Sequence, residues 1–172
     1  VGIVNFNATT QVQGTIGSSS LSLKEINVAA NKTLTTLYSI AAVDINLEAS
    51  ATLRTASDSA IISGAVISKS TTNRATLDVR SNVLVGAVQD VNVNIADNKT
   101  LTVFGGTINS LTLGSLSSLK VNGSMIIDNV TVNPGAGFEN GVAYTIIQAT
   151  DSLQITEFAG KTTSEEYLSA LG

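Results

Sequence analysis

The chain has 172 residues, enough for one domain with a sizeable core, and carries a net charge of −4. Only 13% of its residues are charged, and its nine Lys and Arg residues are spread singly, which excludes the clustered basic surface that nucleic acids require. It contains no Cys and no His, so disulfides, thiolate metal sites and His-based catalysis are excluded too.

The first expected element is a strand–turn–strand unit near the N-terminus. Apolar residues alternate with polar ones from Ile3 onward, and residues 26–35 read I-N-V-A-A-N-K-T-L-T. Alternation with period two is typical of a half-buried strand, and the polar pair Asn31-Lys32 interrupts it as a turn does. Asn tolerates the left-handed conformation that a tight corner demands. This stretch therefore predicts two strands joined by a corner at Asn31.

The middle of the chain repeats this pattern. Alternating segments occur at 43–47, 51–55 and 75–79, and a polar segment that predicts a loop occupies 68–73. Residues 60–67 are apolar at nearly every position, which indicates a strand that is covered on both faces or that lies beside a corner. Residues 93–102 read V-N-I-A-D-N-K-T-L-T and match residues 26–35 at an offset of 67 residues. Such self-similarity predicts a repeat architecture in which the repeating unit is a group of about three coils.

The pattern changes after residue 133. Pro134-Gly135 is the one strong breaker, a strand is expected at 142–147, and Thr163–Glu166 has the spacing of a capping box before a short helix. A repeat structure needs its end covered, because an open end exposes unpaired strand edges. We therefore predict that 1–133 contains the repeats and that 134–172 is a C-terminal capping segment with a short helix.

These elements together predict an all-β fold, a right-handed parallel β-helix (β-solenoid) with a C-terminal cap. The strand–turn–strand units give about six coils of roughly 20 residues each over residues 1–133. Aromatic residues make up only 4% of the chain, as suits a narrow coil with little room for rings. A β-sandwich is the alternative, since it also contains short alternating strands.

No catalytic, cofactor-binding or metal-binding residues are predicted, and no cofactor is expected. A β-solenoid can carry a sugar-cleaving enzyme, but that chemistry needs carboxylates that converge on one site. The carboxylates considered form no recognisable pair along the chain and are interpreted as solvated surface groups: Asp44 and Glu48, Asp90 and Asp97, Asp128, and Asp151. The chain is therefore predicted not to be an enzyme, with a polysaccharide-acting enzyme as a distant alternative.

Two weaker hypotheses concern binding. Calcium prefers six to eight oxygen ligands from closely spaced acidic residues, whereas Asp97-Asn98 and Asp128-Asn129 supply only a few. Thr-Leu-Thr occurs at 33–35 and at 100–102, and ordered rows of Thr could bind ice if they recurred on most coils of one face. Thr is also simply a favoured strand residue, which is the preferred interpretation.

The sequence also resembles a known family. Residues 2–17 read G-I-V-N-F-N-A-T-T-Q-V-Q-G-T-I-G, and residues 23–35 read L-K-E-I-N-V-A-A-N-K-T-L-T. They resemble the passenger repeats of rickettsial cell-surface antigens, the family of outer membrane protein B. Residues 62–66 and 85–88 resemble the Gly-Ala pairs that occur between strands in that family. The resemblance covers residues 2–133 and implies a passenger domain of an autotransporter, anchored at or shed from the outer membrane.

The resemblance and the residues together predict a non-enzymatic bacterial cell-surface domain with a structural or adhesive role, extracellular or at the cell surface. A self-assembling extracellular filament or surface-layer subunit is the alternative. The expected partners are proteins, host surfaces or other copies of the chain. Nucleic acid is not expected as a partner, and this segment is not expected to insert into a membrane.

Overall fold

The computed structural model describes residues 2–133 and 145–158, and every regular element in these ranges is a β-strand. All fourteen strand pairings are parallel, which confirms the predicted β-solenoid and rules out the antiparallel sandwich. The strands are β1 (Ile3–Phe6), β2 (Thr10–Val12), β3 (Leu23–Val28), β4 (Thr33–Thr36), β5 (Ala42–Leu47), β6 (Thr52–Thr55), β7 (Ala60–Ser68), β8 (Thr76–Val79), β9 (Val83–Ile95), β10 (Thr100–Val103), β11 (Gly106–Leu113), β12 (Ser118–Val121), β13 (Met125–Val132), β14 (Ile147–Ala149) and β15 (Leu153–Phe158).

Each turn of the chain passes through three columns of stacked strands, which we call the first, second and third sides. The first side begins with β1, β3 and β5 and continues through parts of β7, β9, β11, β13 and β15. The second side contains β2, β4, β6 and β8, and then the later parts of β9, β11 and β13. The third side contains the beginnings of β7 and β9, followed by β10, β12 and β14.

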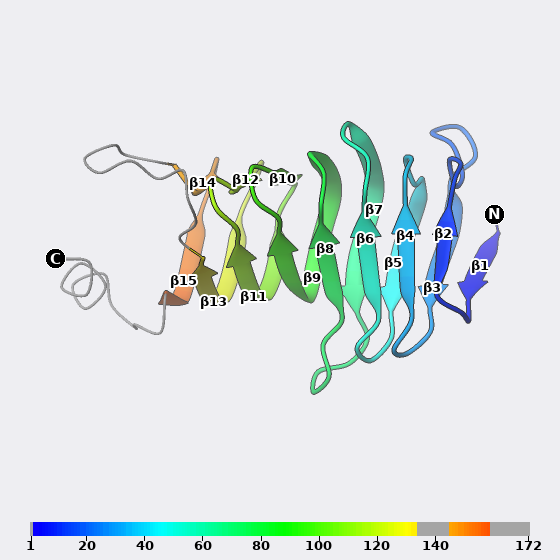
Figure 1. Cartoon of the computed structure of the whole chain (residues 1–172), viewed down its shortest axis with the longest axis horizontal. Coiled ribbons are helices and arrows are strands. Elements are labelled where there is room, and N and C mark those ends of the chain that lie inside the picture. Colours follow the sequence, from blue (N-terminus) through cyan, green and yellow to red (C-terminus); the bar gives the residue numbers. More distant parts are fainter. Residues whose placement is uncertain (1, 134–144, 159–172) are drawn as a thin grey trace, which may run out of the picture.

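The third side gives the number of turns. Its inward rungs are seven residues linked in parallel register: Ile16, Ile40, Ile62, Val85, Val103, Val121 and Ala149. Strand spacing of about 4.8 Å makes the stack ~30 Å long from the first rung to the last. Figure 1 shows the strands side by side along the longest axis, from β1 and β2 at the N-terminal end to β14 and β15.

The core consists of such ladders of inward aliphatic side chains. On the second side the ladder is Leu34, Leu53, Leu77, Val93, Leu111 and Val130, each fully buried. Alternation along each strand puts every second side chain inside, and parallel stacking then places like residues on like. Burial of each Leu or Val stabilises the fold by about 1.5–3 kcal/mol. The apolar period seen in the sequence is thus the core of the solenoid.

The corners between sides use residues in the left-handed conformation. Asn31, Ser50 and Asn98 have φ values of 59°, 56° and 58°. At each of these corners a backbone hydrogen bond closes the turn across three residues, as from Lys32 N to Ala29 O and from Lys99 N to Ala96 O. A positive φ at the third position is the geometry of a type II turn, which Asn adopts more readily than most residues.

The repeated ten-residue stretch, residues 26–35 and 93–102, lies on different sides in its two copies, and we call it the twin stretch. In the first copy, β3 is on the first side and β4 is on the second. In the second copy, the end of β9 is on the second side and β10 is on the third. Three full turns from Ile26 lead to Val88, not to Val93. The prediction that 67 residues form a unit of whole coils is therefore wrong, because the repeated motif is a strand–corner–strand unit that occurs at two different corners.

β7 settles the interpretation of the apolar run at 60–67. Its side chains alternate between buried and exposed, with Ile62 inside and Ile61 49% exposed. The register shifts between Ile62 and Ala65, where β7 passes from the third side to the first. The run is thus a strand beside a corner, and it is not covered on both faces.

The solenoid continues beyond residue 133. β14 pairs with β12, and β15 pairs with β13, so both lie on columns already present. The rest of the predicted capping segment, including the helix expected from Thr163 onward, lies outside the described residues. No helix capable of crossing a membrane occurs within the described ranges.

Candidate functional site

The carboxylates singled out in the sequence lie apart on the surface. Asp44 stacks beside Glu25 on the first side, and Glu48 is exposed at the next corner. Asp90 accepts a hydrogen bond from Thr107 Oγ1 at 2.9 Å and lies 3.6 Å from Arg74 Nη1. Asp128 and Asp151 are exposed. Among the described residues, no three acidic side chains form a group that could hold a metal ion.

One charged cluster forms only in the folded chain. Asp78 Oδ2 accepts hydrogen bonds from Arg54 Nε at 2.7 Å and from Arg80 Nε at 3.0 Å. The Asp78 side chain is 12% exposed, whereas those of Arg54 and Arg80 are 35% and 56% exposed. Hydrogen bonds between ionised partners are stronger than those between neutral groups. Asp78 Oδ2 therefore holds the Nε atoms of both Arg54 and Arg80. We call these three residues the Arg–Asp–Arg cluster.

The stacking register creates this cluster. Arg54 in β6 and Asp78 in β8 are direct partners on the second side, and Arg80 follows two residues after Asp78 on the same outward face. Twenty-four residues separate Arg54 from Asp78, so the pair cannot be recognised from their positions in the sequence. The sequence contains one signal for this pair, which is the similarity of two triplets, Thr52-Leu53-Arg54 and Thr76-Leu77-Asp78. These triplets align residue by residue when β6 stacks on β8.

A groove opens beside the Arg–Asp–Arg cluster. It has a volume of about 400 Å³ and crosses β8, β9 and β11 toward the end of β13. Its polar lining residues are Asp78, Arg80, Asn94, Asp97, Thr112 and Asn133, and its apolar or small lining residues are Ile95, Ala96 and Gly114. Gly114 tolerates no side chain, because a Cβ there would lie 2.7 Å from the backbone nitrogen of Asp97. We call this feature the polar groove.

The whole second side is polar outside. One outward column consists of Thr33, Thr52, Thr76, Asn92, Ser110 and Asn129, and the other of Gln11, Thr35, Arg54, Asp78, Asn94, Thr112 and Thr131. The large hydrophobic side chains that are exposed in the described ranges all lie elsewhere, such as Val43 on the first side and Ile61 on the third. The second side therefore presents hydroxyl, amide and charged groups only.

Both Thr-Leu-Thr triplets can now be placed. Thr33–Thr35 lies in β4 on the second side, and Thr100–Thr102 lies in β10 on the third side. They do not share a face, and Arg54 and Asp78 interrupt the column that contains Thr35. The two triplets therefore do not form one ordered row of Thr.

Another ion pair lies at the corner that leads to the third side. Asp58 accepts hydrogen bonds from the backbone N–H of Asn82 at 2.6 Å and from Lys99 Nζ at 3.3 Å. These contacts lower the pKa of Asp58 below the usual Asp value, with the Asn82 hydrogen bond as the larger cause and Lys99 as the next. Lys99 belongs to the second copy of the twin stretch, where it stabilises the corner through a contact with an earlier turn.

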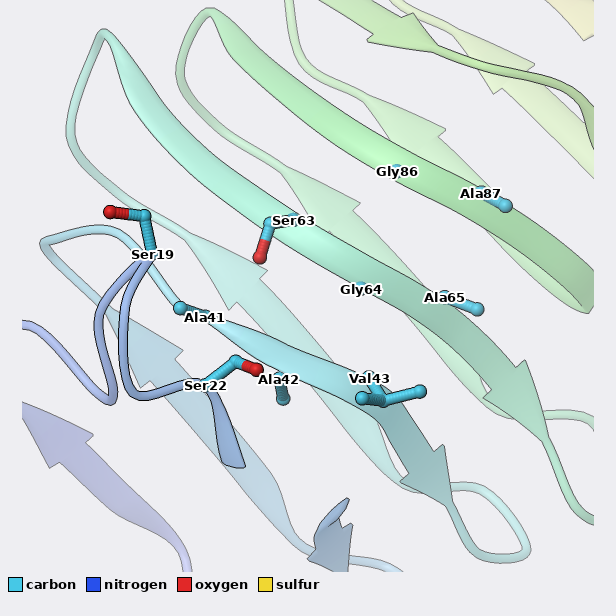
Figure 2. Close-up of a pocket in the computed structure, with 10 residues that line it drawn as sticks. All are labelled: Ser19, Ser22, Ala41, Ala42, Val43, Ser63, Gly64, Ala65, Gly86 and Ala87. Atoms are coloured by element: carbon cyan, nitrogen blue, oxygen red, sulfur yellow. The ribbon is translucent and has the colours of Figure 1, made fainter. Parts of the chain in front are cut away.

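A larger groove follows the corner between the third and first sides (Figure 2). It has a volume of about 520 Å³ and is lined almost entirely by Ala, Gly and Ser, with Val43 as the largest lining residue. A Cβ on Gly86 would lie 2.6 Å from the carbonyl oxygen of Ser63, so the backbones approach too closely for a side chain. This small-residue groove follows from tight stacking of the corner, and its lining contains no charged group.

Comparison with protein-family models, with curated proteins and with solved structures gave no match to this chain.

Proposed function

We propose that the chain is a non-enzymatic domain of the bacterial cell surface with a structural and adhesive role. The observation that carries this proposal is the second side, which presents two unbroken outward polar columns over a core of stacked Leu and Val. A solenoid holds such columns at fixed spacing, because each turn is hydrogen-bonded to its neighbours. It therefore acts as a stiff support for a broad contact surface.

The proposed location is extracellular. The resemblance of residues 2–17 and 23–35 to rickettsial surface-antigen passengers supports it, as does the Thr-, Ser- and Asn-rich outer surface. Partners of this surface would be host-surface molecules or proteins. Nucleic acid fits poorly, because the net charge is −4 and the basic side chains are spread singly.

An adhesion assay tests this proposal. Beads coated with the purified chain are allowed to settle on an epithelial cell layer and are then exposed to flow, with albumin-coated beads as the control. The proposal predicts that chain-coated beads are retained in excess of albumin-coated beads and that soluble chain competes for retention. Equal retention of the two bead types would contradict the adhesive role.

A filament or surface-layer subunit is the second candidate, and the N-terminal end favours it. β1 and β2 are the ends of the strand order, so each has one edge that pairs with no other strand of the described residues. Ile3 is 51% exposed there, and Phe6, Val12 and Ile16 are only partly buried. Such an edge can pair with another chain.

Sedimentation of the wild-type chain and of the edge variant Ile3→Lys tests this candidate. It is favoured if the wild type forms growing assemblies and the variant remains monomeric. A wild type that remains monomeric eliminates it.

A further inference from the structure

We propose that the polar groove binds a neutral saccharide that lies along the axis of the solenoid. This inference rests on the adhesive role proposed above and adds the class of ligand. The groove crosses β8, β9 and β11 to the end of β13, so strand spacing of about 4.8 Å gives it a length of ~14 Å. A site of that length suits an extended oligosaccharide better than a single sugar.

The lining offers the mixed hydrogen-bonding groups that sugar hydroxyls require. Asn94, Thr112 and Asn133 each provide both donors and acceptors, and within the described part of the chain their side chains have no hydrogen-bond partner. Asp97 accepts a hydrogen bond from Ser115 N through Oδ1, and its carboxylate adds an acceptor group to the lining. Each sugar hydroxyl both donates and accepts, so a row of such side chains can satisfy vicinal hydroxyl groups.

The Arg–Asp–Arg cluster organises one end of the groove in advance. Arg80 is bound through Nε to Asp78, and Asp78 is bound in turn by Arg54, so Arg80 is tethered at the groove while its terminal N–H groups can still donate to a ligand. A side chain that is already ordered loses less conformational entropy when a ligand binds. Asn94 lies next to Asp78 in the same outward column, which continues the row of polar groups from the cluster.

The balance of charge favours a neutral ligand over a polyanion. Arg80 contributes one positive charge to the lining, and Asp78 and Asp97 contribute two negative charges. Arg54 does not line the groove and contacts it only through its ion pair with Asp78. A sulfated or uronic chain would meet the Asp97 carboxylate without a surplus of positive charge. The lining residues Ala96 and Gly114 carry no long side chain that would project between the polar residues.

The test is a titration of the ¹⁵N-labelled chain with four neutral hexasaccharides, namely those of β-1,4-glucose, β-1,4-N-acetylglucosamine, β-1,4-mannose and α-1,4-glucose. At least one is expected to shift the amide resonances of Asn94, Ala96, Thr112 and Gly114. Arg80→Gln and Asn94→Ala should each weaken that binding by about tenfold, as expected for the loss of a strong hydrogen bond. Thr33→Ala, on the same side but outside the groove, should leave binding unchanged.

Three results would overturn the inference: no groove shifts with any of the four sugars at millimolar concentration, equal binding by Arg80→Gln and wild type, or a preference for heparin oligosaccharide that disappears at high salt. Circular dichroism of each variant checks that the fold is retained. The bead assay separates this inference from the proposed function. Bead retention without groove shifts refutes only the saccharide, whereas groove shifts without bead retention refute the adhesive role.

Discussion

Asn31 and Asn98 occupy the same left-handed turn position, with φ values of 59° and 58°, at two different corners of the solenoid. Asn31 N donates to Ala49 O and Asn98 N donates to Ser115 O, so each corner is also bonded to the next turn. The surrounding ten-residue stretches are nearly identical, yet one joins the first side to the second and the other joins the second to the third. The same local geometry thus serves two corners.

The corner residues yield a prediction about conformation. Asn98→Ala should lower the free energy of unfolding by about 1 kcal/mol, because Ala is sterically disfavoured in the left-handed region. Asn98→Gly should change it by only about 0.3 kcal/mol, because Gly adopts a positive φ freely. The same pair of substitutions at Asn31 should give similar values. Urea unfolding followed by circular dichroism measures all four variants. If Gly is as damaging as Ala, the Asn side chain and not the backbone conformation determines stability.

The core ladder yields a prediction about packing. Leu53 is fully buried between Leu34 and Leu77, so Leu53→Ala should cost about 2–5 kcal/mol of unfolding free energy. The adjacent Thr52 points outward in the same strand, and Thr52→Ala should stay within about 0.5 kcal/mol of wild type. Comparable losses from the two variants would contradict the inward and outward assignment of β6.

Gly86, in the small-residue groove, yields a prediction about the close approach of two backbone segments. Gly86→Ala should destabilise the chain by about 1–3 kcal/mol, because the new Cβ would lie 2.6 Å from Ser63 O and one turn must move. Gly14→Ala is the matched control, since its Cβ would meet no atom within 4 Å. Thermal unfolding compares the two. A Gly86→Ala variant as stable as Gly14→Ala would mean that the corner is packed less tightly than described.

The Asp58 ion pair yields a prediction about pH. Its pKa in the folded chain lies below the unfolded value, so ionised Asp58 contributes stability above the unfolded pKa and loses it as the pH falls through the folded pKa. Lys99→Gln should raise the Asp58 pKa only in part, because the larger cause, the Asn82 N–H, remains. NMR titration of the carboxyl carbon measures this shift, with Lys120→Gln as the control. Full return to the usual Asp value would instead make Lys99 the dominant cause.

The parts of this fold that depend on local sequence were predictable. Alternation predicted the strands, and Asn31 predicted a corner. Of the polar segment expected as a loop at 68–73, Ser68 ends β7 and residues 69–73 lie between β7 and β8. These features depend on which face of a strand is buried and on which residues tolerate a positive φ.

The parts that depend on the length of each turn were not predictable. Successive rungs of the third side are 18 to 28 residues apart, so stacking partners cannot be assigned by counting. For this reason the second copy of the twin stretch lies one side further along its turn than the first copy does. The contact between Arg54 and Asp78 likewise appears only in the folded chain. The polar groove depends on that register and was missed with it.

Electron microscopy of the purified chain at increasing concentration distinguishes a domain that displays a contact surface from a subunit that polymerises, because the two differ in their assembled form. A domain that displays a contact surface is expected to form separate short rods at every concentration, with a stacked core of ~30 Å. Ordered fibres or sheets that form without a partner would contradict that expectation and would favour the filament or surface-layer role.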